Sequence, residues 1–169
     1  NSILWLLEDN FYSSENLLNE AEKRGVDKKR IIFAKRLTLE DHLERIKFGD
    51  LFLDTFPYSA HTTCSDALRV GLPVLTLKGD SFASRVASSL LNTLNLNELI
   101  SKNLEEYEII ANKVIADPEY FKKIKNKLKE NLSGSPLYDG QLFTKNLEQA
   151  YEKIFKNYID NQTFKNFEI

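Results

Sequence analysis

The sequence predicts an α/β fold in which a parallel sheet is followed by C-terminal helices. Short apolar runs alternate with helical patterns through the first hundred residues, and the pattern is wholly helical after about residue 102. The apolar runs are continuous rather than alternating, as is typical of strands that helices cover on both faces of a parallel sheet. Repeated strand–helix units of this kind favour a right-handed, Rossmann-like arrangement.

The four apolar runs are the candidate strands. Parallel sheets bind their ligands beyond the carboxyl ends of the strands, close to helix N-termini. The search for a site is therefore directed to the loops that follow the first three runs. The runs are residues 3–7, 31–33, 51–53 and 73–77, and the loops are residues 8–14, 34–41 and 54–64.

The helices between the runs have recognisable ends. Gly25 is expected to stop the first helix, because glycine readily adopts the left-handed conformation that follows a helix end. Thr38 followed by Asp41, and Thr63 followed by Asp66, have the spacing of a capping box at a helix start. A fourth helix is expected after the last run.

The C-terminal region is predicted to contain three helices. Asp117-Pro118 separates the first two, because proline is tolerated only in the first turn of a helix. The last helix carries an apolar and aromatic stripe that we expect to pack in the core. The domain is therefore predicted to span residues 1–160, and residues 161–169 form a polar tail. The stripe consists of Phe143, Leu147, Ala150, Tyr151, Ile154 and Tyr158.

Composition excludes several classes of protein. The net charge of −2 argues against nucleic acid as a partner, since phosphate binding needs a concentrated basic surface. The sequence contains neither an apolar stretch of membrane-spanning length nor a signal peptide, which predicts a cytoplasmic protein without membrane contact. The single cysteine, Cys64, suits a reducing compartment. Because the 169 residues include no methionine, we expect the chain to be part of a longer protein.

The loop at residues 54–66 carries the most specific chemistry. A helix N-terminus offers unpaired N–H groups and about half a positive charge, which attract phosphate oxygens. His61, Thr62 and Thr63 would add side-chain donors, and Asp66 would accept hydrogen bonds from sugar hydroxyls. The alternative interpretation, of equal weight on chemistry alone, is that Thr63 and Asp66 only cap the helix. In that case His61 is a loop histidine without a ligand.

Several separated segments resemble the O-linked N-acetylglucosamine transferases and their bacterial relatives. The segments are LFLDTFPY at residues 51–58, AHTT at 60–63, DAL at 66–68, GLPVLTL at 71–77, ASRVA at 83–87 and SPL at 135–137. The resemblance covers residues 3 to 158 and implies a GT-B fold, in which two Rossmann-like lobes bind a UDP-sugar between them. This chain resembles the C-terminal lobe, which supplies most of the donor site.

The resemblance also implies roles for individual residues. The His-Thr-Thr segment would hold the diphosphate, the residue at position 66 would contact the ribose, and two residues on the preceding helix would contact the uracil. Those two are three positions apart and therefore share a helical face; the alternative for the arginine is a surface ion pair with Asp41. The site implied in this way is His42, Arg45, His61, Thr62, Thr63 and Asp66.

The implied activity is that of an inverting glycosyltransferase, which transfers N-acetylglucosamine or a related sugar from UDP to protein serine or threonine. The resemblance implies no cofactor and no metal, with His61 as a stabiliser of the leaving group. It places the acceptor groove in an N-terminal lobe, usually with tetratricopeptide repeats, so we expect this chain alone to be inactive. Leu39 departs from the family because it occupies the position of a ribose-contacting lysine. No catalytic base is identified.

Three alternatives are weighed against this function. A phosphorelay receiver domain would use Asp54 as phosphoryl acceptor, with Thr76 and Lys102 at its switch positions and Mg²⁺ near Glu8-Asp9. Pro57 lies one residue too close to Asp54 for that loop. The other two alternatives are a nucleotide-sugar-binding module without activity and a GT-B enzyme that acts on lipids or glycans.

Overall fold

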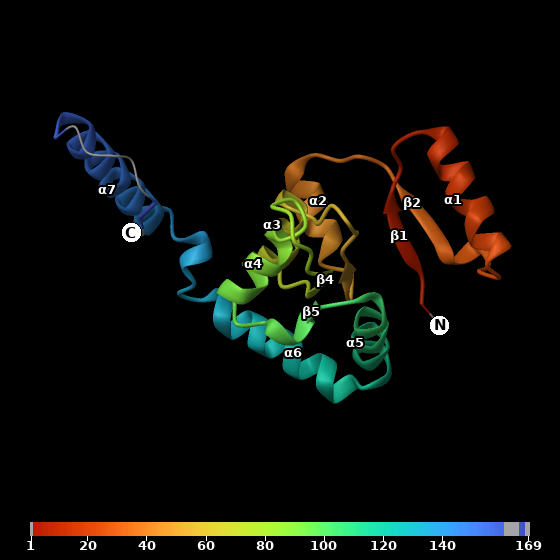
Figure 1. Ribbon diagram of the computed structural model, residues 1–169. Coiled ribbons are helices and arrows are strands. Elements are labelled where there is room, and N and C mark those ends of the chain that lie inside the picture. Colours follow the sequence, from red (N-terminus) through yellow and green to blue (C-terminus); the bar gives the residue numbers. More distant parts are fainter. Residues whose placement is uncertain (1, 161–165, 168–169) are drawn as a thin grey trace. The chain divides into compact units, whose positions relative to one another are not determined.

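The computed structural model describes residues 2–160 and 166–167. The chain forms two compact units, Asn1–Phe48 and Gly49–Ile169, each of which is described by itself. In both units the strands pair in parallel, and helices connect them (Figure 1). The α/β class predicted from the apolar runs is therefore confirmed.

The first unit contains a two-stranded sheet and two α-helices. Strands β1 (Leu4–Leu7) and β2 (Ile31–Ala34) pair along their full lengths. Helix α1 (Phe11–Lys23) connects them, and Gly25 follows it with a φ of 76°, so the predicted stop is confirmed. Helix α2 (Leu39–Ile46) begins after Thr38, whose side chain accepts a hydrogen bond from the Asp41 amide, as the capping box predicts. A short 3-10 helix, Lys28–Arg30, precedes β2.

The second unit is built on a three-stranded parallel sheet with the order β3-β4-β5. Helices α3 and α4 lie on one side of this sheet and α5 lies on the other (Figure 1). Its core includes the fully buried Leu68 of α3, Leu75 of β4 and Leu91 of α4, together with Leu99 of the 3-10 helix that precedes β5. The strands are Phe52–Leu53, Val74–Leu77 and Ile100–Ser101, and the helices are Thr62–Arg69, Val86–Thr93 and Leu104–Ala116.

The remaining elements complete the predicted helical region. Helix α6 (Pro118–Leu132) packs on α5, and Asp117 caps it by accepting from the Tyr120 amide, which confirms the break at Asp117-Pro118. Helix α7 (Gly140–Ile159) is the long final helix. Two 3-10 helices, Asn97–Leu99 and Pro136–Tyr138, precede β5 and α7.

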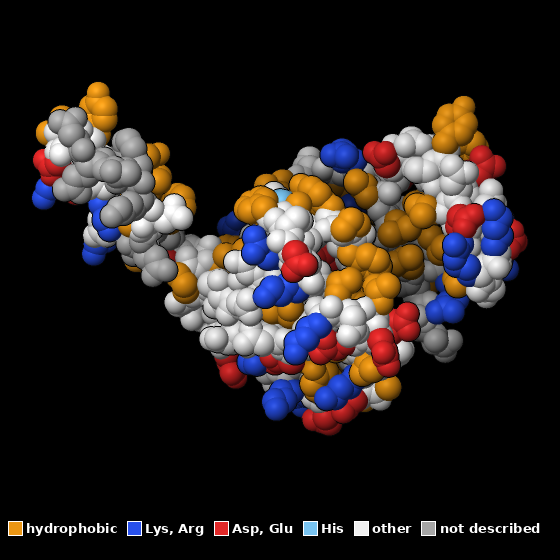
Figure 2. Space-filling view, in the orientation of Figure 1, with side chains coloured by type: hydrophobic (Ala, Val, Ile, Leu, Met, Phe, Trp, Pro, Cys, Tyr) orange, Lys and Arg blue, Asp and Glu red, His pale blue; other side chains and the backbone are white. Residues whose placement is uncertain are grey.

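Two sequence predictions are wrong. Helix α3 begins at Thr62 with His61 as its N-cap, two residues earlier than the predicted N-cap Thr63. His61 makes no side-chain capping hydrogen bond, so Thr63 and Asp66 form no capping box. The stripe on α7 is not in the core: no residue of this helix is buried, and its large hydrophobic side chains are exposed (Figure 2). A helical stripe predicts that one face is apolar, and it does not specify which element covers that face.

Residues 161–165 and 168–169, most of the predicted polar tail, lie outside the described residues. Among the helices of the described chain, none combines the length and the apolar character needed to cross a membrane.

Candidate functional site

The carboxyl ends of β3, β4 and β5 form one edge of the sheet in the second unit. The loops that leave this edge begin at Asp54, Lys78 and Lys102. An open cleft of about 880 Å³ lies between these loops. Its lining includes the apolar side chains of Phe56 and Leu77 and the polar side chains of Ser81, Ser84, Lys102 and Asn103.

Asp54 organises the first of these loops. Its side chain is 4% exposed, and its Oδ1 atom accepts hydrogen bonds from the amides of Thr55 at 2.9 Å and Ala60 at 2.7 Å. Its Oδ2 atom accepts the hydroxyl of Thr76 on β4 at 2.6 Å. One buried carboxylate therefore closes the loop from residue 54 to residue 60 and fixes it to the neighbouring strand.

Two titratable side chains pack near this carboxylate. The Tyr107 hydroxyl donates to the main-chain oxygen of Asp54 at 2.9 Å, and burial together with the charge of Asp54 raises the pKa of Tyr107. The same two causes raise the pKa of the Cys64 thiol to about 12. Both side chains are therefore neutral at physiological pH, and both are structural.

The sequence contained a signal for this arrangement that was missed. Thr76 is the one polar side chain of β4 (Val74–Leu77), and a buried polar group requires a hydrogen-bond partner. Because Leu53 pairs with Leu75 in the parallel register, Asp54 and Thr76 are the next residues along the two strands.

The closed loop leads directly to the N-terminus of α3. His61 is the N-cap, its side chain makes no capping hydrogen bond, and the first turn of the helix contains no acidic residue. Thr62 and Thr63 are exposed, and Asp66 is half-buried one turn further along. By contrast, α5 is capped by Asn103, which accepts from the Glu106 amide. The N-terminus of α3 is thus an electropositive end with donor side chains and no competing carboxylate in its first turn.

The other two predicted site residues lie together on α2 in the first unit. Arg45 donates through Nη1 to the Lys35 main-chain oxygen at 2.7 Å, and its Nη2 atom is 3.4 Å from His42 Nδ1. The guanidinium carbon lies 5.6 Å from the ring centroid of Trp5. Arg45 therefore does not form the alternative ion pair with Asp41 within the described residues, where Asp41 instead accepts from Thr38.

The structure thus groups the predicted residues in two sets. His42 and Arg45 belong to the first unit, and His61, Thr62, Thr63 and Asp66 belong to the second. Leu39 is the first residue of α2 and is 65% exposed. Among the described residues, no group of three or more histidine, cysteine or acidic side chains is arranged to hold a metal ion.

The fold and the arrangement around α3 define an α/β domain of the kind found in glycosyltransferases. The chain belongs to glycosyl transferase family 41, whose model matches residues 1–147. A mutant O-GlcNAc transferase from Thermobaculum terrenum has the same fold, with a TM-score of 0.85 and 34% identity over 92% of this chain and 30% of that protein chain.

Two relatives illustrate the range of the family. A probable UDP-N-acetylglucosamine–peptide N-acetylglucosaminyltransferase SPINDLY from Petunia hybrida is 33% identical over 147 residues, which are 86% of this chain. The UDP-N-acetylglucosamine–peptide N-acetylglucosaminyltransferase of Caenorhabditis elegans is 33% identical over 157 residues, or 93% of this chain. The chain spans 16% of the length of the first relative and 14% of the second.

Family membership and the bonding of Asp54 both argue against the receiver alternative. A phosphoryl-accepting aspartate must present its carboxylate to solvent and Mg²⁺. Here both oxygens of Asp54 accept internal hydrogen bonds and the side chain is buried. Asp54 therefore serves the loop that leads to α3.

Proposed function

We propose that this chain is the UDP-sugar-binding part of an inverting glycosyltransferase that modifies serine or threonine of proteins. The observation that carries the proposal is the N-terminus of α3, where His61 makes no cap and Thr62 and Thr63 are exposed. The names of the relatives specify UDP-N-acetylglucosamine as the donor and a peptide as the acceptor. N-acetylglucosamine or a related sugar is therefore the proposed donor group.

The proposed mechanism concerns the charge that develops on the leaving UDP. The positive end of α3 and the donors of His61, Thr62 and Thr63 stabilise the diphosphate oxygens, and Asp66 accepts from the ribose. Donors that are already oriented supply several kcal/mol to such a transition state. His61 acts as the leaving-group stabiliser, without a metal or another cofactor. His42 and Arg45 contribute contacts to the uracil.

The remaining parts of the proposal concern the whole protein. Residues 1–160 form part of the C-terminal lobe of a GT-B enzyme, and an N-terminal lobe supplies the acceptor groove. Tetratricopeptide repeats present the protein acceptor, and the enzyme works in the cytoplasm. This chain alone binds the donor and does not transfer the sugar.

Calorimetric titration of the chain with UDP, in buffer containing a chelator, tests the proposal. Thr63→Val removes one exposed hydroxyl donor at the site and keeps the shape of the side chain, so we expect about two- to tenfold weaker binding. The matched control is Thr93→Val at the end of α4, where the exposed hydroxyl bonds only to the Ser89 main-chain oxygen. UDP affinity should be unchanged in this control.

Absence of UDP binding, or equal affinity of the Thr63→Val variant and the wild type, contradicts the proposed site. A transfer assay on the full-length protein then separates an enzyme from a binding module. UDP binding without transfer would favour the module.

A further inference from the structure

The main-chain oxygen of Ala83, in the loop after β4, accepts hydrogen bonds from the loop that precedes α3. Its donors are the Ser59 hydroxyl at 2.7 Å, the Ser59 amide at 3.0 Å and His61 Nε2 at 3.4 Å. A carbonyl oxygen only accepts, so the Nε2 atom of His61 carries the hydrogen. In the neutral ring, Nδ1 is then unprotonated.

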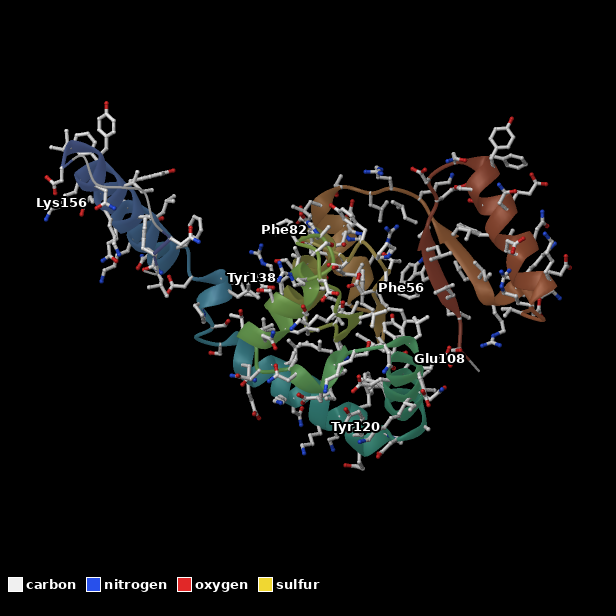
Figure 3. All side chains as sticks on the ribbon, in the orientation of Figure 1. Phe56, Phe82, Glu108, Tyr120, Tyr138 and Lys156 are labelled. Carbon is white, nitrogen blue, oxygen red and sulfur yellow. The ribbon has the colours of Figure 1, made fainter. Side chains whose placement is uncertain are left out.

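Two aromatic side chains fix the plane of the His61 ring. Tyr58 stacks on it with a centroid distance of 4.9 Å and an interplanar angle of 16°. Phe82 (Figure 3) meets it edge-on at 6.0 Å and 88°. Phe82 precedes Ala83 in the chain, so the loop after β4 sets both the plane of the ring and the position of its hydrogen.

A compact hydrogen-bond network holds Ala83 in place. The Ser84 side chain is 6% exposed, and its Oγ atom bonds to the amide, hydroxyl and main-chain oxygen of Ser81 at 3.0, 2.9 and 3.0 Å. The Gly79 amide donates to the Ser84 main-chain oxygen at 3.0 Å. A Cβ atom at position 79 would lie 2.6 Å from Ser84 Cβ and closer still to its Oγ, so any side chain there displaces Ser84.

We infer that Gly79 and Ser84 are positioning residues for His61, which act through the Ala83 carbonyl. They keep the hydrogen on Nε2 and hold the ring in one orientation. The two Ser59 donors lie closer to the carbonyl oxygen, and a carbonyl has two lone pairs, so His61 is the weakest of its three donors. The Nε2–H group of His61 is therefore held in position and can also donate to a phosphate oxygen. The contact with a phosphate oxygen rests on the proposed function, whereas the assignment of the His61 tautomer does not.

The experiment uses ¹⁵N NMR of the histidine rings and UDP titration on the same samples. At alkaline pH, where an imidazole is neutral, wild-type His61 should show a protonated Nε2 and an unprotonated Nδ1. Gly79→Ala should shift His61 toward a mixture of tautomers and weaken UDP binding about two- to tenfold, the range for one neutral hydrogen bond. Gly140→Ala is the matched control, since nothing lies within 4 Å of a Cβ there.

A second variant tests the route through Ser84. Ser84→Gly removes the Cβ and Oγ atoms that an alanine side chain at position 79 would meet. The next nearest atom, the main-chain oxygen of residue 84, would lie 3.9 Å from the alanine Cβ. The Gly79→Ala/Ser84→Gly double variant should therefore match Ser84→Gly alone in both the His61 tautomer and UDP affinity. If Gly79→Ala fails to fold, Ser84→Ala, which adds no bulk, takes its place in both measurements.

The outcomes distinguish the positioning role of Gly79 and Ser84 from the proposed UDP-binding function. A wild-type His61 with its hydrogen on Nδ1, or a Gly79→Ala variant with an unchanged tautomer, overturns the positioning role. The expected tautomers without any UDP binding support the positioning role and count against the proposed function.

Discussion

The hydroxyl of Thr76 lies 2.6 Å from Oδ2 of Asp54 and donates a hydrogen bond to it in the buried core. This bond joins β4 to the loop that leads to α3. The position of the His-Thr-Thr segment therefore depends on a contact between one side chain just after β3 and one on the neighbouring strand β4.

Thr76→Val should lower the free energy of unfolding by about 1.5–3 kcal/mol. Valine keeps the shape of threonine but leaves a buried carboxylate oxygen without its donor, and hydrogen bonds to charged groups fall in that range. Urea denaturation measures the change. Thr76→Ser keeps the hydroxyl, so its free energy of unfolding should fall much less. An equal fall in both variants would show that loss of the hydroxyl does not cause the destabilisation.

Asp54→Ala should be more damaging than Asp54→Asn. Alanine leaves the amides of Thr55 and Ala60 without an acceptor, and each buried unsatisfied group costs about 1–3 kcal/mol. Asparagine keeps an oxygen for both amides, and its amide group can donate to Thr76. We expect UDP affinity in the same order, wild type above Asp54→Asn above Asp54→Ala. The reverse order would contradict a role for Asp54 in shaping the loop.

Because of Cys64, the free energy of unfolding depends on pH in the alkaline range. Burial, together with the charge of Asp54, raises its pKa in the folded protein from 9.0 to about 12. Above the ordinary pKa, the unfolded chain loses a proton that the folded chain retains. The free energy of unfolding therefore falls as pH rises through this window, by at most about 1.4 kcal/mol per pH unit.

The comparison with Cys64→Ala isolates this effect from the other titrating groups. The difference in unfolding free energy between wild type and variant should change by about 1.4 kcal/mol between about pH 8 and about pH 10. A constant difference would show that the thiol ionises equally in both states. In the native protein, Cys64 should also resist thiol reagents until denaturant is added, since the thiolate is the reactive form.

Local signals in the sequence were sufficient for most element boundaries. Thr38 caps its helix as predicted, and the predicted break at Asp117-Pro118 is present, with Asp117 as the cap of the second helix. Such signals are local because a capping side chain bonds to an amide two or three residues away. Strand β5 (Ile100–Ser101) was missed, since only one of its two residues is apolar, whereas both residues of β3 are. The start of α3 was placed two residues too late, at Thr63 as N-cap, because His61 caps without a side-chain bond.

The contacts that support the candidate site were harder to predict from the sequence than the helix ends. His61, Thr62 and Thr63 were predicted as a phosphate site because they stand together between a strand and a helix and match the family resemblance. Their supports are not local: Thr76 is 22 positions from Asp54, and Ala83 is 22 positions from His61. These contacts depend on the parallel register and on the path of the loop after β4, which the sequence pattern does not specify.

His61→Ala in the full-length protein should lower turnover by about ten- to a thousandfold, the range for loss of one positioned donor to a developing negative charge. The reason is that no other side chain at the N-terminus of α3 offers a ring N–H, and the hydroxyls of Thr62 and Thr63 remain. His61→Gln is the informative companion, because its amide N–H can take part of the donor role. It should retain more turnover than alanine. Unchanged turnover in His61→Ala would remove this residue from the mechanism and leave the helix end and the two threonines as the remaining donors.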